Sequence, residues 1–228
     1  TMVLPNPTTK AEAAYWKLRR LIITQEIGAD EPLDEGLLME RLQVGRTPLR
    51  EALKRLAAEQ LVVALPHRTP VVRPFSLTDL EPLFETRMLI EVPVCGLAAQ
   101  RITPAELRTL YETLDILAQH VAARDVYQMV ETDYVFHSQI AHATGNRFLA
   151  DAINQFNLAS LRLWYLAHSR VGVERVVDTH RQLIETLETR DPQVAEAVMR
   201  EHVEMSRRRV VHAFMSGQDL APSFQRVP

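Results

Sequence analysis

Hydrophobic residues recur every three or four positions over most of the chain, which is the spacing of helices that bury one face. The first such pattern predicts a helix over 10–27, which Gly28 should end. The second predicts a shorter helix over 36–43, with Asp34 as its N-cap. The chain therefore opens with two amphipathic helices that can share one core.

A third helix is predicted over 47–60, directly after a tight turn. Thr47 can serve as its N-cap, Pro48 is tolerated in its first turn, and Glu51 completes a capping box. The second and third helices therefore have the pattern of a helix-turn-helix pair.

Two short runs of β-prone residues, 61–65 and 70–73, follow the third helix. Pro66 and Pro70 frame the turn between them, which predicts a small hairpin. Together these elements predict an N-terminal winged helix-turn-helix domain over 10–75.

From residue 76 onward the chain contains helical patterns only, so we expect a mostly α fold. An antiparallel bundle of about six helices should form a second domain over 76–217, with flexible tails at 1–9 and 218–228. Pro93 lies inside the first helix of this bundle and should kink or divide it. The predicted helices span roughly 78–101, 104–123, 126–143, 147–169, 173–189 and 192–215. Four of their starts are marked by the cap residues Thr103, Asp125, Asn146 and Asp191.

The composition limits the class of protein. Apolar residues make up 46% of the chain, which is enough for a packed core. The single cysteine, Cys95, excludes an intramolecular disulfide and suits a reducing compartment. A leader and a run of about 18 apolar residues are both missing, so we expect a cytoplasmic protein without a membrane partner.

Positive charge is concentrated in the first third of the chain. Residues 1–75 carry 11 Lys and Arg against 9 Asp and Glu, whereas residues 76–228 carry 15 against 20. On the third helix, Arg46, Arg50 and Lys54 form one line away from the apolar face. A solvated basic face is one interpretation, but a basic helix after a tight turn is typical of a recognition helix that enters the DNA major groove.

The hairpin extends this basic surface. Its tip carries His67 and Arg68, which can contact the DNA backbone or the minor groove as a wing. We therefore expect a double-stranded DNA operator as a partner.

Four potential metal ligands interrupt apolar helix faces in the second half of the chain. Asp133 and His137 lie one turn apart on the 126–143 helix and project the same way, and His180 and His202 lie on apolar lines of the last two helices. Burying these four groups costs several kcal/mol unless they find partners. A divalent metal ion would satisfy all four, zinc first, with nickel, manganese or iron as alternatives. The other interpretation is that each histidine is a hydrogen-bonded core residue.

The segment GRTPLREALKRLAAEQLV resembles the signature of the GntR family of bacterial transcription regulators, in which a Ser-Arg-Thr-Pro-Val-Arg-Glu-Ala-Leu-like segment opens the recognition helix. This resemblance covers about residues 10–75. The segments TDYVFH, DTHRQLIETL and REHV, within an all-helical region of this length, resemble the FadR branch and its ligand-binding domain of the FCD type. Six helices in this region are closer to the VanR-like subgroup.

The resemblance implies roles for individual DNA-binding residues. Arg46 and Arg50 match arginines that contact bases and phosphates, and Thr47 matches a phosphate-contacting residue. Three positions depart from the family pattern: Gly45 replaces the usual Ser or Thr, Thr69 replaces the usual wing glycine, and Gly36 replaces an arginine that contacts DNA in some members. Each departure removes a possible backbone contact, so operator affinity or preference should differ while the DNA-binding role remains.

The resemblance also implies an effector site, since many FadR-branch domains bind a metal through an Asp and three His at these motifs. Arg87 matches an arginine that often points into the same cavity, where it could clamp a small organic acid together with the metal. The alternative for Arg87 is a salt bridge to Glu91, one turn on. Arg162 is a second candidate for the clamp, and Trp164 is expected in the core. The remaining histidines of the second half are expected at the surface or in packing: His120, His142, His168 and His212.

These features together predict a ligand-responsive transcription regulator. We expect a repressor that binds a pseudo-palindromic operator as a homodimer and is modulated by a small carboxylate. The alternative is a metal-dependent enzyme that uses the same Asp/His cavity. No motif places a general base or nucleophile beside that cavity, and an enzyme would leave the basic helix without a role. The sequence does not identify the effector, the metal loaded in the cell, the operator or the regulated genes.

Overall fold

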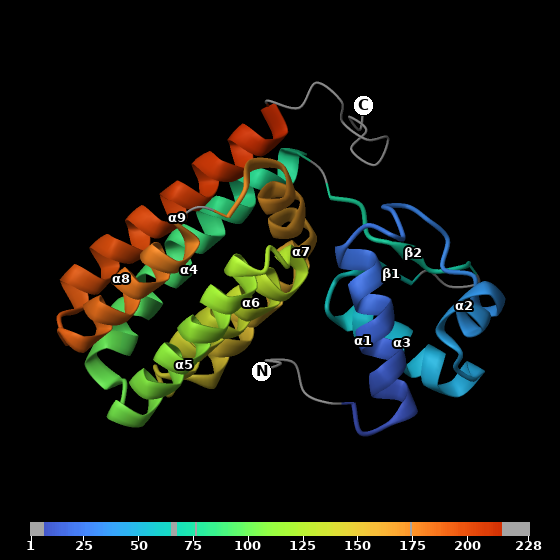
Figure 1. Cartoon of the computed structure of the whole chain (residues 1–228), viewed down its shortest axis with the longest axis horizontal. Helices are drawn as coiled ribbons and strands as arrows, with labels where there is room; N and C mark the ends of the chain where they lie inside the picture. Colours follow the sequence, from blue (N-terminus) through green and yellow to red (C-terminus); the bar gives the residue numbers. More distant parts are fainter. Residues whose placement is uncertain (1–6, 65–67, 76, 174, 216–228) are drawn as a thin grey trace.

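The computed structural model describes residues 7–64, 68–75, 77–173 and 175–215, which form two helical units side by side (Figure 1). The N-terminal unit, in blue and cyan, consists of three helices and a hairpin, and the C-terminal unit, from green to red, is a bundle of long helices. The predicted mostly α fold with two units is confirmed. The N-terminal helices are α1 (Lys10–Ile23), α2 (Glu35–Leu42) and α3 (Arg46–Ala58).

The start of α1 uses residues that the sequence analysis assigned to a flexible tail. The Thr9 hydroxyl accepts a hydrogen bond from the Glu12 amide, and the Glu12 carboxylate accepts one from the Thr9 amide, both at 3.1 Å. Thr9 therefore belongs to the folded domain. The helix ends before the predicted residue 27, because Gln25 adopts a left-handed φ of 62° that an α-helix does not continue.

The caps of α2 and α3 differ in how well they were predicted. The Asp34 side chain accepts from the Leu37 amide at 2.9 Å, so this predicted N-cap is confirmed. For α3 the prediction was wrong, since Gly45 is the N-cap and Thr47 already lies inside the helix. As in other helices, the N-cap carbonyl, here that of Gly45, accepts the first helical hydrogen bond, from the Leu49 amide at 3.2 Å.

The hairpin is antiparallel but shorter than predicted. Its strands are β1 (Val62–Val63) and β2 (Val71–Val72), paired in the register Val62↔Val72 and Val63↔Val71. Pro32 forms an additional bridge to Val71, so the loop between α1 and α2 lies against the hairpin. Residues 65–67 of the turn lie outside the described part of the chain.

The C-terminal unit contains six α-helices among its described residues, as predicted. They are α4 (Leu80–Arg101), α5 (Pro104–Ala122), α6 (Val126–His142), α7 (Arg147–Val171), α8 (Val176–Glu188) and α9 (Pro192–Met215). Pro93 does not divide α4. The predicted caps Thr103, Asp125, Asn146 and Asp191 all accept hydrogen bonds from backbone amides of the helices that follow them.

Each unit has its own core. In the N-terminal unit, Leu18, Leu49 and Leu56 are fully buried among other aliphatic residues. In the bundle, Phe136 and Leu161 belong to a second, larger cluster, to which α1 contributes Ile23. Two cores agree with the two predicted domains.

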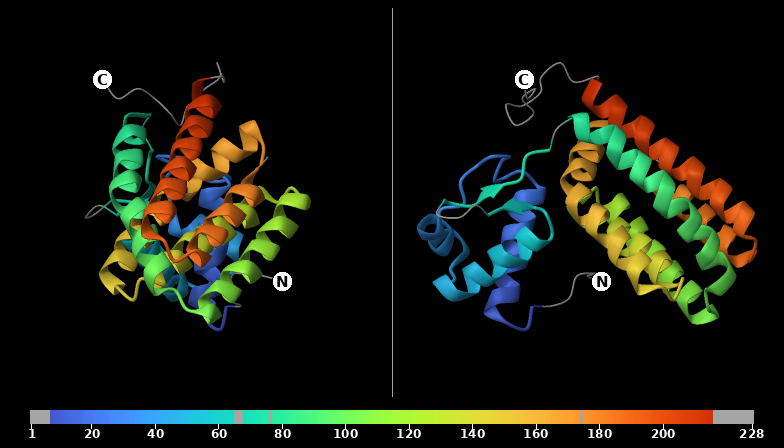
Figure 2. Two further views of the ribbon diagram at one scale, coloured as in Figure 1. Left: turned by 90° about the vertical axis from the view of Figure 1, so that its left-hand side faces the viewer. Right: turned by 180° about the vertical axis from the view of Figure 1, so that it is seen from behind.

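The two units also contact each other through buried polar groups. In the rear view of Figure 2, α1 lies beside the face of the bundle formed by α6 and α7. Arg19 of α1 makes a salt bridge of 2.7 Å with Glu131 of α6, and the two side chains are only 1% and 0% exposed. Arg20 stacks over the Tyr127 ring, 5.1 Å from its centroid. Helix α6, which also carries Asp133 and His137, therefore contacts the N-terminal unit directly.

Candidate metal centre, effector cavity and DNA-binding surface

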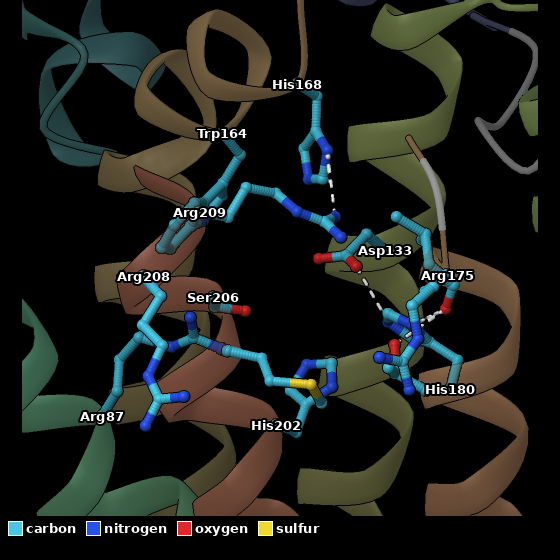
Figure 3. A pocket seen from close by; sticks show the side chains of 13 residues that line it. Arg87, Asp133, Trp164, His168, Arg175, His180, His202, Ser206, Arg208 and Arg209 are labelled. Carbon is cyan, nitrogen blue, oxygen red and sulfur yellow. Dashed lines mark hydrogen bonds and ion pairs between the residues drawn. The ribbon is translucent and has the colours of Figure 1, made fainter. Parts of the chain in front are cut away.

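The four predicted metal ligands lie together in the bundle. Asp133 and His137 project from α6, His180 from α8 and His202 from α9, and Figure 3 shows three of them around one cavity. One ring nitrogen from each of the three histidines lies within 4.8 Å of the others. The Asp133 carboxylate lies 2.8 Å from Nε2 of His180. Helix α6 and the consecutive helices α8 and α9 thus bring three imidazoles together, with the Asp133 carboxylate beside one of them.

The hydrogen bonds of His180 determine which of its ring nitrogens can bind a cation. Its Nδ1 lies 2.7 Å from the Val176 carbonyl oxygen, which can only accept, so Nδ1 carries the proton. Nε2 then faces the Asp133 carboxylate at 2.8 Å. This contact is favourable in two ways: Nε2 carries a second proton and donates it to Asp133, or both groups face a metal ion.

His137 is oriented in the same way by a second carboxylate. Its Nδ1 lies 3.4 Å from Glu91, while its buried Nε2 has no hydrogen-bond partner within the described chain. A carboxylate behind the imidazole fixes the tautomer that presents the other nitrogen to a metal. The nitrogens of His137 and His180 without a hydrogen bond lie on the side of the cluster, and a divalent cation fits this set of donors.

The electrostatics of the cluster favour the deprotonated ligands that metals require. Burial lowers the pKa of His137, and burial together with the neighbouring imidazoles holds the pKa of His202 well below its ordinary value. Burial alone would raise the pKa of the Asp133 carboxyl, but the imidazoles, His180 foremost, hold it well below its usual range. At neutral pH the cluster therefore offers the neutral imidazoles of His137 and His202 and the carboxylate of Asp133.

A cavity of about 240 Å³ adjoins the cluster. Its walls combine the metal-ligand side chains with an aromatic ring and several cations, and Trp164 packs edge to face on Phe84 at 5.8 Å. Trp164 is thus both a core residue and part of the cavity wall. The residues labelled on this cavity in Figure 3 are Arg87, Asp133, Trp164, His168, Arg175, His180, His202, Ser206, Arg208 and Arg209.

The two predicted effector-binding arginines have different positions. Arg87 lines the cavity and also makes the alternative salt bridge to Glu91, with Nε 2.5 Å from the carboxylate. Arg162 does not reach the cavity, because it donates to the Arg73 carbonyl at 2.5 Å. Residues two apart on a helix point in nearly opposite directions, so Arg162 faces the N-terminal unit while Trp164 faces the cavity. The prediction for Arg162 is corrected accordingly.

Some cavity residues were missed in the sequence. His168, expected at the surface or in packing, lines the cavity one turn after Trp164. Arg209 lies two turns after His202 and therefore on the same face of α9. The helical spacing from Trp164 and from His202 could have predicted these two cavity residues. Arg175 lies in the connection before α8, where no helical spacing predicts its position.

The predicted basic line lies on the exposed face of α3. Arg46 and Arg50 are 65% and 59% exposed, and Thr47 and Lys54 are exposed beside them. Glu35 of α2, which the sequence analysis did not single out, lies 2.7 Å from Arg50 and 3.8 Å from Arg46. The exposed basic face of α3 therefore has a carboxylate beside two of its arginines.

The wing is only partly described. Arg68 is exposed at the end of the turn, as is Thr69 in the position where a wing glycine was expected. His67 lies outside the described residues, so its predicted DNA contact stays a prediction.

The geometry defines a DNA-binding regulator with a regulatory domain, and comparison with known proteins agrees. Residues 10–72 match the family of bacterial regulatory proteins called gntR, and residues 82–205 match the FCD domain. The chain belongs to the GntR family of transcription regulators and carries an FCD domain. The family is one of DNA-binding regulators rather than enzymes, so the enzyme alternative is wrong.

Curated relatives carry the same kind of description. The chain is 26% identical to the HTH-type transcriptional repressor RspR of Escherichia coli K12 over 201 residues, which cover 87% of this chain and 88% of the relative. It is 28% identical to the HTH-type transcriptional repressor GlaR of the same strain over 209 residues, 86% and 92% of the two chains. Both relatives are named as repressors.

Solved structures share the fold at lower identity. The structure titled E. coli McbR/YncC superimposes with a TM-score of 0.76 at 19% identity, covering 91% of this chain and all of that one. A GntR regulator from Rhodococcus sp. RHA1 gives 0.72 at 19% identity, covering 90% and 99%. These likenesses concern the fold alone. Among the helices of the described residues, none combines the length and apolar character needed to cross a membrane.

Proposed function

We propose that this regulator is a metal-containing repressor whose affinity for DNA is changed by a small carboxylate bound in the bundle. The observation that supports it best is the pair of buried, unpartnered imidazole nitrogens of His137 and His180 beside the Asp133 carboxylate. Such groups are costly to bury unless a cation completes them. Relatives named as repressors support the sign of regulation.

Asp133, His137, His180 and His202 would hold the metal, zinc first, with nickel, manganese or iron as alternatives. When bound, the ion supplies a Lewis-acid centre that attracts a carboxylate oxygen. Arg87 stays fixed by Glu91 at the cavity wall, and its remaining N–H groups are placed to donate to the same carboxylate.

The N-terminal unit would read the operator through α3 and the wing. Arg46 and Arg50 would contact base edges and phosphates, Thr47 and Lys54 phosphates, and the wing residues His67 and Arg68 the neighbouring backbone. Helix-turn-helix proteins bind paired half-sites as dimers, so we infer a homodimer on a pseudo-palindromic operator in the cytoplasm.

The contacts between the two units would allow effector binding in the bundle to change the position of the DNA-binding unit. Glu131, clamped to Arg19, lies two residues before Asp133 on α6, so one helix carries both a metal ligand and the interdomain salt bridge. On α7, Arg162 holds the Arg73 carbonyl in the connection after β2, while Trp164 lines the cavity. An effector that prefers one arrangement of α6 and α7 would therefore bias the position of the DNA-binding unit, by as much as its affinities for the two arrangements differ.

The experiment begins with selection of operator DNA from a random library by the purified chain. Operator affinity is then measured by fluorescence anisotropy with and without chelator, and with small organic acids that raise the melting temperature. We expect at least one acid to raise the melting temperature only in the metal-loaded protein and to weaken operator binding at least tenfold. Effects that persist unchanged in the presence of chelator would overturn the proposed metal-dependent effector site.

A further inference from the structure

The effector cavity has several cations on its walls. Among the described lining residues, the charged groups are the guanidinium groups of Arg87, Arg175, Arg208 and Arg209 and the carboxylate of Asp133 (Figure 3). Two of the arginines have carboxylate partners behind the wall: Arg87 is bound to Glu91, and Arg208 lies 3.2 Å from Glu204. Their charge is therefore largely offset before any ligand arrives.

Arg175 differs from these two arginines. Its side chain is exposed at the cavity, and no ion pair is seen for it anywhere in the described part of the chain. Its backbone adopts a left-handed φ of 64° at the N-cap of α8.

Arg209 lines the cavity from α9. Its Nη1 lies 3.4 Å from Nδ1 of His168, and that same ring nitrogen lies 3.2 Å from the Gly172 carbonyl, to which it can only donate. In the tautomer that donates to Gly172, His168 does not accept a hydrogen bond from the guanidinium. Burial and the nearby guanidinium lower the pKa of His168, so the imidazole is neutral and does not add to the charge.

We propose that the effector is a small dianion, with one carboxylate at the metal and Arg87 and a second anionic group held by Arg175 and Arg209. This inference rests on the proposed metal-dependent effector site. The net charge at the cavity would be +2 with a divalent ion bound, since Asp133 subtracts one charge and Arg175 adds one. This sum treats the charge of every other arginine as offset. A monocarboxylate would be attracted to only one of these two charges, whereas a dianion would be attracted to both.

The simplest ligand of this kind is a short dicarboxylate. The cavity volume of about 240 Å³ admits only a small acid. Arginine recognises a carboxylate through two parallel hydrogen bonds, which fixes the orientation of the second group as well as its charge.

The test compares succinate and glutarate with their monomethyl esters, which keep the chain length and lose one charge. Binding to the metal-loaded full chain is measured by isothermal titration calorimetry. We expect each diacid to bind at least tenfold more tightly than its ester. In Arg175→Gln and in Arg209→Gln the ratio of diacid affinity to ester affinity should fall several-fold. The affinity for the diacid should drop, while that for the ester stays the same.

Glutamine is a suitable replacement at position 175, because Gln25, Gln43 and Gln60 already adopt a left-handed φ in this chain. Arg200→Gln is the matched control, since Arg200 is exposed on α9 and does not line the cavity. It makes the same change in charge and should leave the ratio unaltered. Melting temperature and metal content identify any variant that fails to fold. If one of Arg175→Gln and Arg209→Gln does not fold, the affinity ratio of the other variant tests the inference.

The outcomes separate this inference from the proposed function. Metal-dependent binding of diacids and esters with equal affinity would overturn the dianion and leave the metal-dependent effector site standing. An equal loss for both probes in Arg175→Gln and Arg209→Gln would assign these arginines to the first carboxylate and also overturn it. If neither diacids nor monoacids bind, with or without metal, the proposed effector site and this inference both fail.

Discussion

At the scale of single residues, the geometry around His180 explains why four polar groups are buried in one place. Its Nδ1 donates to the Val176 carbonyl, so Nε2 meets Asp133 either as the N–H of an imidazolium or as a potential metal ligand. A metal ion would bind both groups and leave the imidazole singly protonated. Without one, the same four groups would weaken the bundle they occupy.

Replacing both His180 and His202 by Ala should therefore remove the bound metal. We expect about one ion per chain in the wild-type protein and close to none in the double variant, measured by elemental analysis after dialysis. His142→Ala is the control, because His142 is exposed on the same helix as His137 and outside the cluster. A double variant that retains the wild-type metal content would contradict the site.

The recognition helix offers a second test at this scale, in which two neighbouring residues should act in opposite directions. Arg50→Ala should weaken operator binding by about 1–3 kcal/mol, the usual value of a good base contact. Glu35→Gln should strengthen it a few-fold, because Glu35 holds Arg50 at 2.7 Å and repels phosphate. Both are measured by fluorescence anisotropy on the selected operator.

The salt dependence of the same measurement checks the interpretation. Loss of one phosphate-neutralising cation should reduce the slope of log affinity against log salt by about one. An Arg50→Ala variant with unchanged affinity and slope would remove α3 from the DNA interface. Lower affinity in Glu35→Gln would show that Glu35 positions Arg50 for DNA rather than competing for it.

At the scale of elements, helix starts could be predicted where a side chain caps the helix. Thr103, Asp125 and Asn146 were found in the sequence because their side-chain oxygens accept from amides two or three residues on, a local interaction. The start of α3 was missed because Gly45 contributes only backbone there, and Thr47 carries the expected cap chemistry two residues too late. Helix ends set by a left-handed residue such as Gln25 have no comparable signal.

Because Thr103 caps a helix and Thr47 does not, replacing each by Ala should have unequal effects on stability. Thr103→Ala should destabilise the protein by about 1 kcal/mol, because it removes the capping box with Glu106. Thr47→Ala should change stability by less than about 0.5 kcal/mol, since Thr47 is exposed and caps nothing. Calorimetric melting of the two variants checks this, and equal losses would restore Thr47 as a structural cap.

At the scale of the whole molecule, the division into two domains was predictable and the contact between them was not. Periodicity and the change from hairpin to helices mark the boundary near residue 75. The buried pair Arg19–Glu131 joins residues that local pattern treats as ordinary charges on two unrelated helices. Arg162 was misassigned for the same reason, since an arginine on an apolar helix suits a ligand site as well as an interdomain contact.

The interdomain salt bridge between Arg19 and Glu131 should couple effector binding to operator binding. Glu131→Gln leaves the Arg19 guanidinium buried without its counter-ion, which typically costs about 3–5 kcal/mol. We expect this loss to loosen the docking of α1 on α6 while the metal ligands on the other face of α6 stay in place. Metal content and effector affinity should therefore be close to wild type, and the effect of effector on operator affinity should fall at least fivefold.

The control is the double variant Arg19→Met with Glu131→Leu, which fills the same space with apolar groups. Replacing a buried ion pair in this way is often neutral or stabilising, so docking and stability should recover. Recovery of the effector response in this variant would show that coupling needs close packing of the two units, and its continued absence would show that it needs the ionic pair itself. A full response in Glu131→Gln would exclude this contact as the route, leaving the Arg162–Arg73 contact on α7 to carry the signal.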